Sequence, residues 1–303
     1  MIDVFINVIL PVFLVAVIAG LFQRWRNVPA SSVSQVTLYI LAPALIFESL
    51  IEQEMPATAS VGIIVTVLVG TILLISSSYV ISKIMGQEND MRSAFVLSTA
   101  FPNAGNLALP VLLLAFGDEA LAVGIVIFVT QATLGNSFGV FVAANSTMNI
   151  LSAVKQIFKL PAIYATILAV IVRVFDMDLP NLVNEPISLL ARSAIPMMLV
   201  VLGLQFSGKI GLENPFSLST AILIRLIFSV PLMYGVSSVF GLSPLAQGVV
   251  IVVYAMPVAV FTTILATEFN THPKFVTNAV VISTVLSTLT LTLVIQVSKG
   301  LIN

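Results

Sequence analysis

Residues 101–110 read Phe-Pro-Asn-Ala-Gly-Asn-Leu-Ala-Leu-Pro and lie in the middle of a long apolar stretch. Proline removes a backbone hydrogen bond and clashes with the preceding turn, so Pro102 should interrupt any helix formed here. Backbone groups freed inside a membrane are tolerated only where protein buries them or where they line a cavity. The stretch therefore predicts a broken helix whose free amides, with Asn103, Gly105 and Asn106, face a substrate. The alternative is a kinked packing helix whose asparagines bond to neighbouring helices.

The composition around this stretch is that of a membrane protein. Of the 303 residues, 59% are hydrophobic and only 8% are charged, whereas a soluble domain carries about 25% charged residues. Because so few charges cannot cover a water-exposed surface, most of the chain should lie in the lipid bilayer. A net charge of −1 gives no reason to expect a nucleic-acid partner. The absence of cysteine excludes disulfides and Cys-ligated zinc.

Ten apolar runs predict an all-α integral membrane protein with ten transmembrane helices, since each such helix needs about 20 mainly apolar residues. The runs are 4–22, 31–50, 59–82, 92–115, 119–143, 157–175, 185–206, 216–240, 244–267 and 274–298. The loops between them are short, so we expect no separate soluble domain.

The basic residues predict how these helices are oriented. Eight of them lie in the loops that follow the odd-numbered helices. They are Arg24, Arg26, Lys83, Arg92, Lys155, Lys159, Lys209 and Lys274. The opposite loops carry mainly acidic residues, and only Arg173 and Lys299 clearly lie on that side. Because basic loops stay in the cytoplasm, we expect both termini to lie outside.

Three prolines of the first half recur in the second half after 150, 153 and 155 residues. The pairs are Pro11 and Pro161, Pro43 and Pro196, and Pro102 and Pro257. Dividing the chain into 1–150 and 151–303 gives each half five helices, and an odd number inverts the second half in the membrane. Inverted repeats with interrupted helices are typical of secondary transporters. Helices 4 and 9 would then cross at mid-membrane, where helix N-termini attract anions.

Three further polar residues inside the predicted helices are candidates for the substrate site. Arg225 lies about 13 Å deep, counted at the rise of an α-helix. It is either a counter-charge for an anion or gate, or it reaches cytoplasmic phosphates. Gln131 and Asn136 lie on helix 5, where amides also bond between helices. We expect no metal site and no enzyme, because the single histidine, His272, has no ligand partner in sequence and no catalytic motif appears.

The whole chain resembles the auxin efflux carrier family, which spans bacterial permeases and plant auxin carriers. The most specific likeness covers residues 102–110 and 255–273. The resemblance implies ten helices in two inverted five-helix repeats with broken, crossing helices 4 and 9, similar to sodium–proton antiporters and bile-acid symporters. It further implies a homodimer in a bacterial inner membrane.

By position, the resemblance makes Asn103 a substrate contact and makes Pro102 and Pro257 the crossover prolines. It places Gln131 on the wall of the site and Asn136 where plant members have a tyrosine.

The family implies a secondary active transporter that moves a small organic anion by alternating access. The anion is auxin in plants and a dicarboxylate such as malate or malonate in some bacterial members. Here residues 160–165 lack the two asparagines of the corresponding plant motif, which weighs against auxin itself. Helix 3 has no charge before Lys83, so coupling to H⁺ or Na⁺ cannot be assigned to a charged pair there. The alternatives are an anion channel or a uniporter without ion coupling; an intramembrane enzyme is a third.

Overall fold

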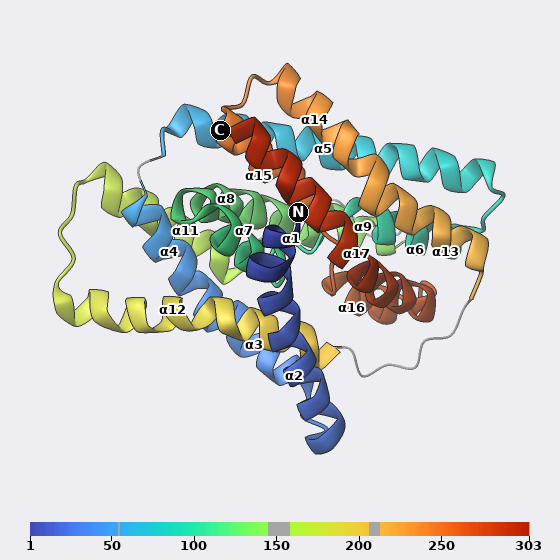
Figure 1. The fold of residues 1–303 in the computed structure, drawn as a ribbon, viewed down its shortest axis with the longest axis horizontal. Helices are drawn as coiled ribbons and strands as arrows, with labels where there is room; N and C mark the ends of the chain where they lie inside the picture. The colour runs from blue at the N-terminus through green and yellow to red at the C-terminus, as the bar shows by residue number, and fades with distance from the viewer. Residues whose placement is uncertain (54, 145–157, 206–212, 303) are drawn as a thin grey trace.

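A computed structural model of the protein describes residues 1–53, 55–144, 158–205 and 213–302, which are helical almost throughout (Figure 1). The first half contains α1 (Ile2–Val4), η1 (Phe5–Ile9), α2 (Leu10–Arg26), α3 (Ala30–Val36), η2 (Thr37–Leu41), α4 (Ala42–Glu52), α5 (Ala57–Ile84), α6 (Asn89–Ala100), α7 (Ala108–Phe116), α8 (Asp118–Leu134), η3 (Gly135–Gly139) and α9 (Val140–Ala143). The second half contains α11 (Pro161–Val174), α12 (Asn181–Leu204), α13 (Pro215–Leu223), η5 (Ile224–Phe228), α14 (Ser229–Val239), α15 (Pro244–Tyr254), α16 (Phe261–Glu268) and α17 (Pro273–Ile302).

Seven of the described helices are long and apolar enough to cross a bilayer, which supports a multi-pass membrane protein. They are Ile2–Arg26, Ala30–Glu52, Ala57–Ile84, Asp118–Ala143, Asn181–Leu204, Pro215–Val239 and Pro273–Ile302. The other three predicted helices are shorter pieces. Helices 4 and 9 are each divided in two, and α11 has 14 residues, or about 21 Å. The predicted loop residues Lys155 and Lys209 lie outside the described residues.

Among the described residues four wide π-helical turns, labelled η, interrupt the long helices, and prolines account for three of them. η1, η2 and η5 lie just before Pro11, Pro43 and Pro231. Because proline lacks an N–H and clashes with the carbonyl one turn back, the preceding turn opens. In η3 the side chain of Asn136 instead donates to the carbonyl of Ala132 at 2.8 Å, and π-turns of this kind recur at functional sites.

The helices pack in two groups. In the first group α12 packs on α2 and on α4, and α4 also packs on α11; α5, α6, α8, α14, α15 and α17 form the second set of contacts. Figure 1 shows α4, α11 and α12 on one side and α6, α13 and α16 on the other. Within the first group α2 and α12 touch through small residues, since a Cβ added to Gly203 would lie 2.1 Å from the carbonyl oxygen of Ala16. Such close backbone approach is typical of membrane helix pairs.

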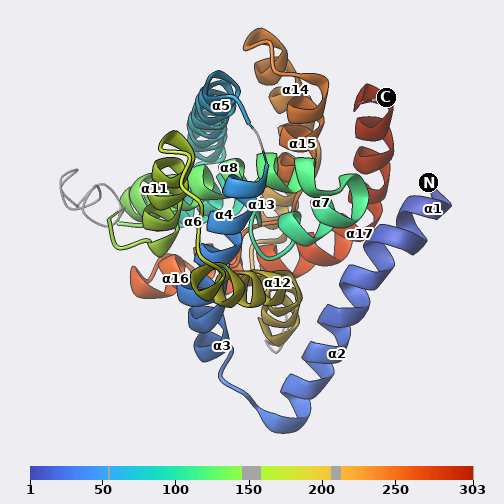
Figure 2. The same cartoon turned by 90° about the vertical axis from the view of Figure 1, so that its left-hand side faces the viewer.

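The two ends of the chain lie side by side (Figure 2). The amino group of Met1 donates to the side-chain oxygen of Gln296, near the end of α17, at 3.2 Å. Residues near the two ends of the described chain are therefore in direct contact.

Candidate functional site at the crossing of two interrupted helices

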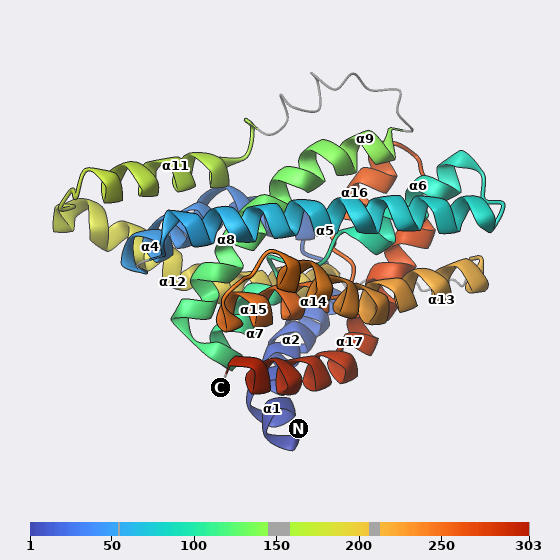
Figure 3. The same cartoon turned by 90° about the horizontal axis from the view of Figure 1, so that it is seen from above.

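Two helices are interrupted where the sequence places its central prolines. Residues 101–107 separate α6 from α7, and residues 255–260 separate α15 from α16. Pro102 and Pro257 lie within these breaks. In Figure 3 the pieces surround the middle of the molecule beneath the long helix α5. We call the two breaks together the crossing.

The two breaks bind each other through their backbones. They pair in antiparallel fashion, with Pro102 opposite Val258. The flanking hydrogen bonds run from the amide of Asn103 to the carbonyl of Pro257, 2.8 Å, and from the amide of Ala259 to the carbonyl of Phe101, 3.0 Å. Backbone groups that the prolines release are thus satisfied between the two helices, which is how a membrane protein can hold irregular backbone at depth.

Asn103 is buried at this junction and its side chain has a free donor. Only 4% of the residue is exposed, and its side-chain nitrogen has no hydrogen-bond partner among the described residues. Leaving a buried polar group unpaired costs about 1–3 kcal/mol, and such groups are uncommon in folded proteins. An amide held in this way is suited to donate to a ligand.

Gly105 and Asn106 follow Asn103 in the turn that leads into α7. A Cβ added to Gly105 would lie 2.8 Å from the ring of Phe128 on α8, so α8 packs directly on this turn. Asn106 is half-buried. The structure therefore brings Asn103, Gly105 and Asn106 together at the N-terminal end of α7.

Arg225 reaches the crossing from η5 and is completely buried. Its two terminal nitrogens donate to the carbonyls of Thr99, at 2.9 Å, and Tyr254, at 2.5 Å. These carbonyls belong to the last turns of α6 and α15. The hydroxyl of Ser229 also donates to the carbonyl of Tyr254, at 2.6 Å. In this arrangement the guanidinium points to helix ends in the protein interior and not to the membrane surface.

Gln131 and Asn136 have different surroundings, although both lie on the helix from Asp118 to Ala143. The side-chain nitrogen of Gln131 donates to the hydroxyls of Thr71, at 3.0 Å, and Tyr254, at 2.7 Å. Its side-chain oxygen has no partner among the described residues. Asn136 bonds to its own helix, as described for η3. Gln131 is thus linked to the crossing through Tyr254. The side-chain amide of Asn136 bonds within its own helix and not to the crossing.

The electrostatics of the crossing follow from its four helix ends. The C-terminal ends of α6 and α15 carry partial negative charge, and the N-terminal ends of α7 and α16 carry partial positive charge. Arg225 lies at the negative pair. In the part of the chain that the structure describes, Arg225 is the sole charged residue that is buried, and every Asp and Glu there is at least partly exposed. The positive pair is therefore available to a negative ligand.

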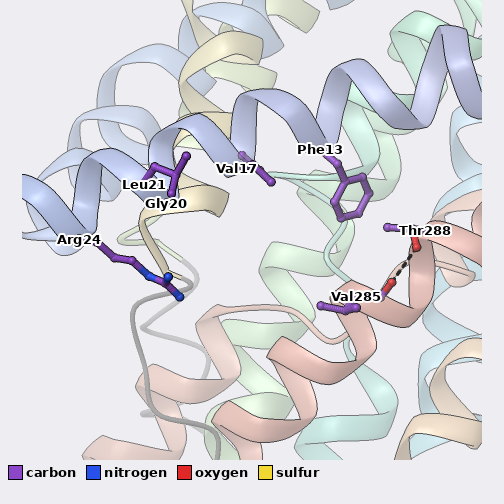
Figure 4. A pocket seen from close by; sticks show the side chains of 8 residues that line it. Phe13, Val17, Gly20, Leu21, Arg24, Val285 and Thr288 are labelled. Carbon is purple, nitrogen blue, oxygen red and sulfur yellow. Dashed lines mark hydrogen bonds between the residues drawn. The ribbon is translucent and has the colours of Figure 1, made fainter.

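Two cavities lie away from the crossing. One of about 340 Å³ opens between α2 and α17, with Arg24 at one end (Figure 4). Its lining residues are Phe13, Ala16, Val17, Gly20, Leu21, Arg24, Val285 and Thr288. The other, of about 360 Å³, lies beside Gln35, Val36, Tyr39 and Ile40. Neither is lined by a predicted site residue, so a ligand entering them does not meet Asn103.

Two residues that were not predicted as site residues also bond to the crossing. Tyr254 bonds to Arg225 through its backbone carbonyl and to Gln131 through its hydroxyl. The hydroxyl also donates to the carbonyl of Val67 at 3.0 Å. The hydroxyl of Ser283 on α17 accepts from the amide of Val258 at 3.1 Å. The position of Tyr254, three residues before Pro257, was the one available signal, because the last turn before a break exposes its carbonyls.

Comparison with known proteins agrees with a transport role. A family model described as "Membrane transport protein" matches residues 4–147 and 143–295. An uncharacterized transporter of Methanocaldococcus jannaschii is 24% identical over 297 residues, covering 94% of this chain and 95% of the relative. The resemblance to auxin efflux carriers is confirmed, and because the family model matches nearly the entire chain, the protein belongs to this family of membrane transport proteins.

Proposed function

We propose that the protein is a secondary transporter that carries a small organic anion, and that the anion binds at the crossing. The observation that carries the proposal is the side-chain amide of Asn103, which is buried and unpaired at the start of the turn into α7. A carboxylate accepts hydrogen bonds at both oxygens. Binding one would pair the free amide and place negative charge beside helix N-termini.

The charges around the crossing favour an anion over a cation. Buried cation sites in transporters usually include a carboxylate. Among the described residues none of the acidic side chains is buried, so a metal ion or protonated amine would meet no counter-charge. The same observation gives the second candidate function, an anion uniporter, because proton coupling generally requires a buried titratable acid.

Burial of Asn103 supports alternating access. A site that is covered on all sides can exchange its ligand only if the surrounding helices move. The two groups of helices offer such a division, because each packs closely within itself. We propose that the interrupted helices 4 (α6 and α7) and 9 (α15 and α16), together with α11, complete ten spans in two inverted repeats, and that the crossing is the fixed centre of the motion.

Counterflow in proteoliposomes tests this function. Purified protein is reconstituted in vesicles loaded with an unlabelled carboxylate, and uptake of the labelled compound is followed after dilution. A carrier gives saturable, transient accumulation above equilibrium, whereas a channel or an inactive protein gives none. Repeating the measurement with imposed proton or sodium gradients separates a coupled carrier from a uniporter, because only coupled uptake depends on the gradient.

A further inference from the structure

Arg225 contacts equivalent points of the two interrupted helices. Thr99 lies three residues before Pro102, and Tyr254 lies three residues before Pro257. The two carbonyls that accept from Arg225 therefore occupy matching positions, 155 residues apart, which is the spacing of the two prolines. A single side chain from a third helix thus holds both C-terminal helix ends.

The chemistry of arginine suits this double contact. The guanidinium is a planar fork with five N–H donors, so one group can donate to two carbonyls in different directions. Ser229 adds a third bond at the same place, since its hydroxyl donates to the carbonyl of Tyr254 and lies one turn after Arg225. The ring of Tyr254 lies 5.7 Å from the guanidinium carbon, which is within the range of a cation–π contact.

The helix ends also balance the buried charge. Each helix C-terminus is equivalent to roughly −0.5 elementary charge, and each N-terminus to roughly +0.5. The ends of α6 and α15 together offset the single positive charge of Arg225. The N-terminal ends of α7 and α16 then leave the crossing with a surplus of about one positive charge.

We propose that Arg225 is a positioning residue that caps both interrupted helices, and that the charge balance it sets makes the site selective for singly charged carboxylates. The second part rests on the proposed anion site, whereas the first part does not. The competing assignment is that Arg225 binds the anion directly through its Nε–H, which has no partner among the described residues.

Hydrogen exchange of the ligand-free protein tests the cap. In Arg225→Gln we expect amides in the last turns of both α6 and α15 to exchange roughly tenfold faster or more, because bonds to a charged group are lost at both. Arg192→Gln, at an exposed arginine of α12, is the matched control and should leave both segments unchanged. Unchanged exchange of both segments in Arg225→Gln would overturn the cap.

Arg225→Lys keeps the test decisive if the Gln variant does not fold. Lysine retains the charge but lacks the planar fork, so at least one of the two segments should exchange faster than in the parent protein. Full protection of both segments in the Lys variant would show that charge alone is sufficient and would contradict the shared cap.

Matched carboxylates test the charge selectivity. The melting temperature is measured with equal concentrations of butyrate and succinate, and of hexanoate and adipate. We expect the monocarboxylate of each pair to stabilise the protein more, and a larger effect of the dicarboxylates would overturn the selectivity. If no compound of either pair stabilises the protein, the proposed anion site and its selectivity fail, while hydrogen exchange still decides the cap.

Discussion

The main-chain amide of Asn103 donates to the carbonyl of Pro257 at 2.8 Å, and this bond joins the two interrupted helices at the residue whose side chain carries the free donor. The bond uses only the backbone of Asn103. The side-chain amide can therefore be altered without removing this bond. This separation allows the binding role of Asn103 to be tested apart from its structural role.

Gly105→Ala should destabilise the crossing. The new methyl group would lie 2.8 Å from the ring of Phe128, so the ring or the turn must move. Overpacking of this kind typically costs about 1–3 kcal/mol, and we expect a lower melting temperature together with weaker carboxylate binding. Gly235→Ala on α14 is the control, because a Cβ there meets nothing within 4 Å. Equal melting temperatures of the two variants would show that the turn is loosely packed.

Tyr254→Phe should weaken the link between α8 and the crossing. The hydroxyl of Tyr254 accepts from Gln131 and donates to the carbonyl of Val67, so its removal leaves buried groups with fewer partners. We expect a loss of about 1–3 kcal/mol in stability, measured as a lower melting temperature. Tyr234→Phe, at a half-exposed tyrosine, should change it little. A Tyr254→Phe protein as stable as its parent would mean that this network contributes nothing measurable.

The breaks at Pro102 and Pro257 could be predicted from sequence because proline acts on its own helix. Its missing N–H and its ring disturb the turn before it whatever surrounds them. That the two breaks lie together was also predicted, because Pro102 and Pro257 are one of three proline pairs with nearly constant spacing.

The partners of Arg225 were not predictable in the same way. The depth of Arg225 could be estimated from the rise of an α-helix. That depth was equally compatible with a counter-charge for an anion and with an arginine that reaches phosphates at the membrane surface. Thr99 and Tyr254 lie in the last turns before the two breaks, where carbonyls are exposed, but no residue pattern shows that the donor is a side chain 126 or 29 residues away. The structure has seven long apolar helices among its described residues, because the predicted helices 4 and 9 are divided at Pro102 and Pro257 and α11 has 14 residues.

Both termini should be accessible from outside the cell. The basic loops predict this orientation, and the bond between Met1 and Gln296 places the two ends on one side. Because the chain has no cysteine, a cysteine introduced at Ile2 or at Gly300 can be labelled with a membrane-impermeant maleimide in whole cells. We expect both to react, and Gly86→Cys, between α5 and α6, to react only after the membrane is opened. The reverse pattern would invert the topology.

The central claim is that the buried amide of Asn103 binds a carboxylate, and Asn103→Ala tests it most directly. Affinity for the best-binding carboxylate and melting temperature without ligand are measured on the same purified variant, with the exposed Asn184→Ala as control. Loss of a hydrogen bond to a charged group should weaken binding by about 1.5–3 kcal/mol, or at least tenfold. The melting temperature should hold or rise, because an unpaired buried donor has been removed. Unchanged affinity with a lowered melting temperature would contradict the claim and make Asn103 a structural residue.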